Sequence, residues 1–262
     1  MAIGISMIML TADAPICAED LHQQLAEYWR GLPPVSEFNE DDGTLSLEIG
    51  GASLIIAKMP APIPWSDLAG PCATSLLWKN AADEVKQHTV HWIVTITGDL
   101  EPLRLTKILT QATAAALATC EEAIGVYWGK ATLVIPKNIF IDFTKQVLPH
   151  GAPMHIWVDF RVGKDSDTSS SGFTVGMKAL GHMELETQGA PEPPSELRER
   201  LLALAGYVVE NGPVIQDGDT VGEDAQERIR VVYSDSSFGH EDKVMRLTYE
   251  TASTKNPWWK PW

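Results

Sequence analysis

The sequence predicts an α+β fold of two ferredoxin-like βαββαβ units from an internal duplication, with a mostly antiparallel sheet and C-terminal α/β additions. Apolar segments follow the order β-α-β-β-α-β over residues 1–98, and the same order recurs over residues 89–163. Short sequences also recur at corresponding places. Trp78-Lys79-Asn80 and Pro136-Lys137-Asn138 each stand at the start of a predicted helix.

The first half is predicted from turn signals and periodicity. Its elements, in order, are a strand at 3–10, a helix at 18–29, strands at 45–49 and 52–58, a helix at 76–87 and a strand at 89–97. Gly50-Gly51 can adopt the positive φ angles of a tight hairpin turn. The strand at 89–97 is apolar on both faces, which is typical of the middle of a sheet.

The second half shares the strand at 89–97. Its other elements are a helix at 103–123, strands at 125–128 and 131–135, a helix at 138–147 and a strand at 154–162. The extension 164–262 contains a strand at 173–178, a segment at 179–188 that fits either a helix or a strand, a helix at 195–210, and strands at 228–233 and 244–249. The extension has too few elements to enclose a core alone, so we expect residues 1–262 to form a single compact body.

Composition limits the classes of partner. The chain has 262 residues and a formal net charge of −15, which opposes binding to nucleic-acid phosphates. The same charge favours encounter with a basic protein, although an ordinary acidic surface explains it as well. Three cysteines without metal-type spacing indicate reduced thiols and a cytoplasmic location. No apolar run approaches the roughly 20 residues that cross a bilayer, so we expect no membrane association.

One group of residues could hold a metal ion. His182, Glu184 and Glu186 alternate, so on a strand they would share one face and could bind a divalent cation or act as acid and base. On a helix they would scatter, and a solvated acidic edge is the simpler interpretation. His88 and His91 have an HxxH spacing, but they fall at a helix end and on a strand, which favours a structural role for both.

An acidic loop and an aromatic segment are candidate partner-binding regions. Asp217, Asp219, Glu223 and Asp224 resemble a cation loop only loosely, and a flexible acidic loop fits better. Trp258, Trp259 and Trp262 are separated by prolines, so this segment either docks in a groove of its own protein or presents aromatic anchors to a partner. The chain contains no glycine-rich phosphate loop and no nucleophile elbow, and we predict no cofactor.

Several segments together resemble a bacterial family of cytosolic proteins of unknown function. They are residues 75–97, the N-terminal ISMIMLTADAPICAEDLHQQL, the hairpin followed by KMPAPIPW, and GMKALGHMELE, so the resemblance covers nearly the whole chain. Members are associated with type VI secretion and polymorphic toxin loci. The resemblance therefore implies an immunity protein, and it carries no catalytic residues over to this chain.

These observations favour a cytoplasmic protein-binding protein, an immunity protein that neutralises a basic type VI toxin or effector by occlusion. One alternative is a metal-dependent enzyme that uses His182, Glu184 and Glu186. Another is a secretion adaptor or chaperone that grips an effector with its tryptophan segment. The sequence leaves the oligomeric state open.

Overall fold

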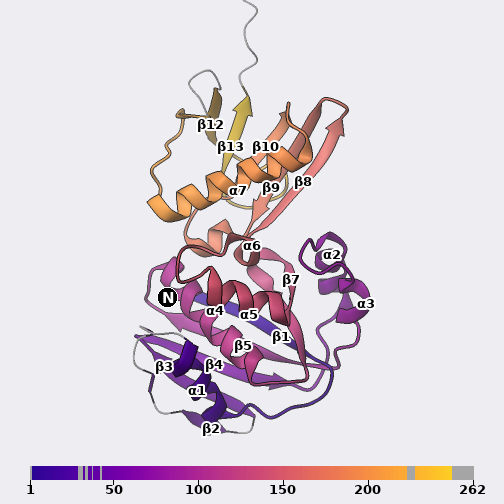
Figure 1. The fold of residues 1–262 in the computed structure, drawn as a ribbon. Coiled ribbons are helices and arrows are strands. Elements are labelled where there is room, and N and C mark those ends of the chain that lie inside the picture. The colour runs from indigo at the N-terminus through magenta and orange to yellow at the C-terminus, as the bar shows by residue number, and fades with distance from the viewer. Residues whose placement is uncertain are drawn as a thin grey trace, which may run out of the picture. The chain divides into compact units, whose positions relative to one another are not determined.

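A computed structural model describes residues 2–28, 32, 35–36, 38–41, 43–222 and 228–249. The chain divides into two compact units. The first comprises residues 1–159 and 175–182, and the second comprises residues 160–174 and those from 183 onward. Figure 1 labels the elements of both. The prediction of one compact body of 262 residues stays a prediction.

The described part of the first unit contains a seven-stranded sheet in the order β2-β3-β4-β5-β1-β6-β7, with antiparallel neighbours throughout. Its strands are β1 (Ala2–Leu10), β2 (Asn39–Asp41), β3 (Thr44–Ile49), β4 (Ala52–Met59), β5 (Val90–Gly98), β6 (Ala123–Trp128) and β7 (Leu133–Pro136). The helices are α1 (Ala18–Tyr28), α2 (Trp65–Thr74), α3 (Ala81–Val85), α4 (Pro102–Ala118), α5 (Lys137–Gln146) and α6 (Met154–Trp157), with 3₁₀ turns η1 (Gly129–Ala131) and η2 (Met177–Leu180).

Strict alternation in β4 and β5 explains how this sheet buries one face. Every second residue of β5 from Trp92 to Gly98 is buried, and those between are half-buried. The buried positions of the sheet face α4, where the Ser6 and Thr113 hydroxyls form a buried hydrogen bond of 2.7 Å. Figure 1 shows α4 and α5 lying across these strands. The α+β class, the predominance of antiparallel pairs and the central position of the strand at 89–97 are confirmed.

The ferredoxin-like duplication is not confirmed. A split βαβ unit needs two parallel strands with another strand between them, but β4 and β5 are direct antiparallel neighbours. The strand predicted at 154–162 is wrong in its first half, because residues 154–157 form the helical turn α6. The indole N–H of Trp157 there donates to Thr110 of α4 at 2.8 Å. The strand that follows, β8 (Asp159–Ser166), belongs to the other sheet.

The described part of the second unit is built on a six-stranded sheet in the order β11-β12-β13-β10-β9-β8. Besides β8, its elements are β9 (Ser169–Val175), β10 (Leu185–Ala190), α7 (Pro194–Asn211), β11 (Thr220–Val221), β12 (Ile229–Ser234) and β13 (Val244–Tyr249). β10 pairs with β13 in parallel, whereas β9–β10, β11–β12 and β12–β13 are antiparallel. The ambiguous segment at 179–188 therefore contains the end of η2 and the start of a strand.

Candidate functional site

Helix α7 supplies one wall of the candidate site in the second unit. Pro193 precedes the helix and Pro194 occupies its first turn, where a missing N–H costs no hydrogen bond. One side of α7 packs on the sheet closely, because a Cβ at Gly172 of β9 would lie 3.1 Å from Leu201. The helix ends at Gly212, whose φ of 79° suits glycine. Arg200, Ala203, Leu204 and Tyr207 consequently lie along the side of α7 that faces the segment after it.

Two acidic side chains hold that segment in place. A carboxylate oxygen of Asp217 accepts the backbone N–H of Tyr233 at 2.8 Å, and one of Asp219 accepts the backbone N–H of Gln216 at 2.7 Å. The hydroxyl of Tyr233 donates to the carbonyl of Ile215. The predicted flexible acidic loop is therefore anchored to β12 over residues 215–219. Glu223 and Asp224 lie outside the described residues.

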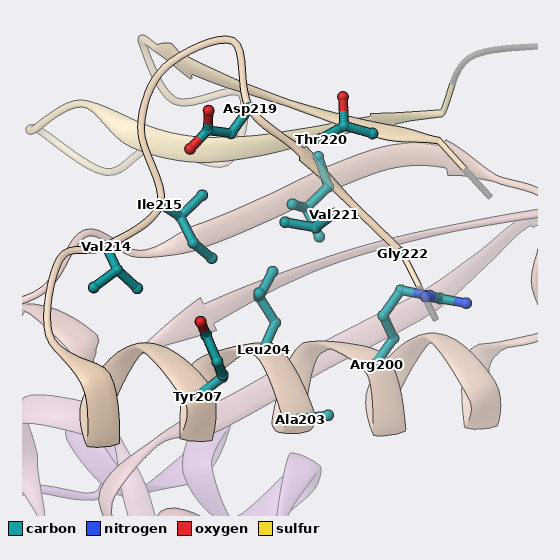
Figure 2. A pocket seen from close by; sticks show the side chains of 11 residues that line it. Arg200, Ala203, Leu204, Tyr207, Val214, Ile215, Asp219, Thr220, Val221 and Gly222 are labelled. Carbon is teal, nitrogen blue, oxygen red and sulfur yellow. The ribbon is translucent and has the colours of Figure 1, made fainter. Parts of the chain in front are cut away.

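Between α7 and residues 214–222 lies an open pocket of about 510 Å³ (Figure 2). Its walls mix apolar and polar surface, and Tyr207 and Val214 remain 51% and 50% exposed. The polar groups at the pocket are the Arg200 guanidinium, the Tyr207 hydroxyl, the Asp219 carboxylate and Thr220. The full lining is Arg200, Ala203, Leu204, Tyr207, Val214, Ile215, Asp219, Thr220, Val221, Gly222 and Leu247. Such a pocket suits an apolar group that carries a polar or charged end.

The positive charge at the pocket is already matched. The Nε of Arg200 lies 2.7 Å from Oε1 of Glu192, and both side chains are largely buried. The hydroxyl of Tyr249 donates to the same oxygen at 3.0 Å. Glu192 balances Arg200, and Asp219 adds a carboxylate to the residues that line the pocket. A cationic group on a ligand would be attracted to the Asp219 carboxylate.

The alternating residues of the metal hypothesis lie as follows. Glu184 is buried, and its carboxylate accepts the hydroxyl of Thr174 at 2.7 Å. Glu186 on β10 is fully buried and accepts the hydroxyl of Ser236 and the backbone N–H of Ser237, the latter at 2.9 Å. His182 follows η2 in the first unit, and burial lowers the pKa of its imidazole. Within the described residues, no three His, Cys, Asp or Glu side chains gather as metal ligands.

The carboxylate of Glu186 organises the loop between β12 and β13. The guanidinium of Arg246, on the neighbouring strand β13, lies 3.7 Å from this carboxylate. The Oγ of Ser236 accepts the backbone N–H groups of Phe238 and His240, each at 3.0 Å. His240 touches Ser236 through its backbone, while its ring packs edge-on against Phe173. The serine and histidine residues here form a loop anchor, because a catalytic pair needs the ring nitrogen on the hydroxyl.

The histidines of the HxxH motif make backbone contacts in the first unit. The Nε2 of His88 accepts the N–H of Ile63 at 2.8 Å, while Nδ1 donates to the carbonyl of Val85 at 2.5 Å. The Nδ1 of His91 donates to the carbonyl of Ala61 at 2.7 Å, and burial lowers the pKa of this imidazole. Both rings thus fix residues 61–63 beside the sheet, as the structural interpretation predicts.

Residues 173–248 match a domain of unknown function, DUF4261. The matched segment runs from β9 to β13 and includes every residue that lines the pocket, as well as Glu184 and Glu186. Neither the curated proteins nor the solved structures contain a match to this chain. No helix in the described ranges has the length and apolar character that crossing a bilayer requires.

Sequence reasoning missed most of this pocket. One of the residues missed is Leu204 of α7, whose side chain is half-buried and lines the pocket. The two large apolar residues that follow the helix, Val214 and Ile215, could have indicated the pocket, because such side chains need a surface to pack on. Among the predicted candidates that the structure describes, Asp219 is the one that reaches the pocket lining. Trp258, Trp259 and Trp262 lie outside the described residues.

Proposed function

We propose that this chain is a cytoplasmic protein-binding protein, and that the pocket beside α7 receives an apolar anchor from a basic partner. The observation that carries the proposal is the open pocket of mixed polar and apolar lining, with the exposed side chains Tyr207 and Val214. Aromatic side chains in such positions often dominate interface energetics. An apolar surface held open to solvent needs a function to offset its cost in solubility.

Charge supports the choice of a basic partner. The chain carries a net charge of −15, and Asp219 stands at the pocket while Glu192 neutralises Arg200. Complementary charge accelerates encounter and excludes acidic competitors. The resemblance to proteins of type VI secretion and toxin loci extends the proposal. On that basis the partner is an interbacterial toxin or effector, and the chain is an immunity protein that acts by occlusion.

Co-expression tests the immunity role. The product of the adjacent gene is expressed in a susceptible host alone and together with this chain. We expect toxicity alone and growth in the presence of the native chain. Tyr207→Ala is expected to weaken the rescue, whereas Leu76→Ala removes an exposed apolar residue of the first unit and should leave it intact. The immunity role fails if no neighbouring product is toxic and rescued, and the pocket assignment fails if Tyr207→Ala rescues fully.

The adaptor alternative makes a separate prediction. If the tryptophan segment grips an effector, deletion of residues 257–262 abolishes binding and leaves the melting temperature unchanged. A pocket-centred interface predicts that the same deletion preserves binding. A lower melting temperature after the deletion would instead indicate that the segment docks on its own chain.

A further inference from the structure

Strand β13 brings the chain to one end of the pocket beside α7. Leu247 of this strand lines the pocket, and Tyr249 lies on the same face because it follows two positions later. The hydroxyl of Tyr249 donates to the carboxylate oxygen that also pairs with Arg200. In the sheet, Tyr249 is paired with Ile229, which is paired in turn with Val221 of the pocket lining. The described chain therefore ends beside Arg200 and Val221.

The pocket is long enough to have two distinct ends. Figure 2 shows Arg200 and Gly222 toward one end, and Tyr207 and Val214 toward the other. Arg200 and Tyr207 are about two turns apart on α7, or about 10 Å along its axis. Ala203 lies between them and is exposed, so its small side chain leaves room that a larger one would fill. A volume of about 510 Å³ suits a drug-sized group, which is larger than a single indole ring.

The sequence that follows Tyr249 matches the chemistry of the pocket. Residues 251–262 contain three tryptophans, two lysines and no acidic residue, in a chain whose net charge is −15. Indole rings supply a large apolar contact area together with an N–H donor. Lys255 and Lys260 would be attracted to the carboxylate of Asp219 in the pocket lining. The segment thus carries the apolar and cationic groups that the pocket suits.

From these observations we propose that the pocket beside α7 is the docking site for residues 251–262 of the same chain. Eight residues, 250–257, separate Tyr249 from Trp258, and they span up to about 29 Å when extended. Tyr249 lies two strand spacings, or about 10 Å, from Val221. The tryptophans therefore reach the pocket even if the chain first reverses direction. Pro257 and Pro261 restrict the backbone of the free segment, which lowers the entropy cost of docking.

The covalent connection favours this occupant over a separate molecule. A short linker gives the segment an effective concentration in the millimolar range at the pocket. A contact with a dissociation constant of about 0.1 mM between separate molecules would then be made roughly ten times more often than broken. Docking also covers tryptophans that would be an apolar liability in water. No partner is needed, so self-docking does not depend on the proposed function.

Self-docking would regulate access to the pocket, and this consequence rests on the proposed function. A partner that inserts its own anchor must first displace the segment. The apparent affinity is reduced by the fraction of molecules in which the pocket is free, which corresponds to about tenfold at the occupancy above. Deletion of residues 257–262 should therefore strengthen partner binding by up to about tenfold.

Fluorine NMR of the whole chain labelled with fluorotryptophan tests the docking without a partner. Phenylalanine substitutions assign the resonances of Trp258, Trp259 and Trp262. We expect at least one of these resonances to be shielded from a neutral, soluble gadolinium chelate. The shielding should be the same at every protein concentration, because the contact lies within one molecule.

A substitution in the pocket identifies where the segment docks. Ala203→Arg places bulk and positive charge in the pocket, so it should raise the relaxation enhancement of the shielded resonance at least fivefold. Ala73→Arg makes the same change at an exposed alanine of α2 in the first unit and should leave the resonance shielded. Asp219→Asn keeps an oxygen that can accept the N–H of Gln216 but removes the charge, so it should weaken the shielding at low salt.

Three results overturn the proposal. The first is a native chain whose three segment tryptophans are all as accessible as free fluorotryptophan. The second is shielding that survives in both Ala203→Arg and Asp219→Asn, which would place the segment elsewhere. The third is shielding that increases with protein concentration, which would assign the pocket to the segment of a second copy. Circular dichroism establishes that each variant is folded. Failure of the co-expression test leaves these measurements unaffected, so the two proposals fail separately.

Discussion

The two sheets of this protein bury different chemistry at their centres. The central strands β1 and β5 of the first sheet contain no acid, lysine or arginine. The central strand β10 of the second sheet buries Leu185, Glu186 and Thr187 in succession, and Glu186 is wholly inaccessible. The first sheet therefore depends on steric packing, whereas the second depends on a polar network whose members must all be satisfied. Substitutions should affect the two sheets through different mechanisms.

The largest effect is expected in the polar network. Glu186→Ala leaves the backbone N–H of Ser237 and the guanidinium of Arg246 without the carboxylate, at a cost of about 3 kcal/mol in the free energy of unfolding. Urea unfolding measures the loss, and hydrogen exchange should show lower protection in β10 and β13. Glu199→Ala, on the exposed side of α7, is the matched control and should change stability little. If the two substitutions lower the free energy of unfolding equally, the buried hydrogen bonds of Glu186 contribute no more to stability than an exposed carboxylate does.

A smaller, purely steric effect is expected in the first sheet. A Cβ at Gly125 would lie 2.5 Å from the carbonyl oxygen of Ile135 and 2.5 Å from the ring of Trp78. Gly125→Ala should therefore destabilise the protein by about 2 kcal/mol through overpacking. At Gly129 the nearest atom to such a Cβ is 3.8 Å away, so Gly129→Ala is the control. Urea unfolding of the Gly125→Ala and Gly129→Ala proteins measures the difference in their stability. A Gly125→Ala protein as stable as Gly129→Ala would contradict the close packing of Gly125 against Ile135 and Trp78.

The pH dependence of stability should trace to buried histidines. Burial lowers the pKa of His91, so the folded state binds a proton less readily than the unfolded state. The stability that His91 contributes is complete above the unfolded pKa of about 6.5 and is lost as the pH falls through the folded pKa. Burial shifts the pKa values of His155 and His182 in the same direction. The urea midpoint of the native chain should fall as the pH is lowered, and that of His91→Gln should fall less steeply. If both proteins lose stability with the same slope against pH, His91 does not contribute to the pH dependence.

The smallest effect is expected from metal ions. The carboxylates of Glu184 and Glu186 already accept protein hydrogen bonds, so added Zn²⁺, Mn²⁺ or Mg²⁺ should not shift the melting temperature. Thermal denaturation with and without each ion, together with metal analysis of the purified protein, makes this measurement. A shift that disappears in Glu184→Gln would favour the enzyme alternative built on His182, Glu184 and Glu186.

The first sheet was the more predictable of the two. Gly50-Gly51 located the hairpin of β3 and β4, and the apolar character of residues 89–97 located β5 at the centre, because both signals are local. Helix α2 was missed, since Pro71 lies inside it and proline is unfavourable in a helix interior. The helix predicted at 76–87 is only α3 in the structure, with five residues.

The candidate site was less predictable, because it depends on contacts between distant residues. The pocket exists only when residues 214–222 fold back over α7, and Asp217 secures that fold through Tyr233 on a later strand. No periodicity signals such a contact. Likewise, Glu186 looked like part of a solvated acidic edge until its partners Ser236 and Ser237 were placed beside it.

Calorimetric titration of the purified chain with the toxic product of the adjacent gene tests the central claim most directly. We predict saturable binding that weakens with added salt. The affinity should fall about 30-fold in Tyr207→Ala, the size of an aromatic anchor worth about 2 kcal/mol, and stay at the native value in Leu76→Ala. An affinity of Tyr207→Ala equal to that of the native chain would contradict the claim that the pocket beside α7 receives the partner.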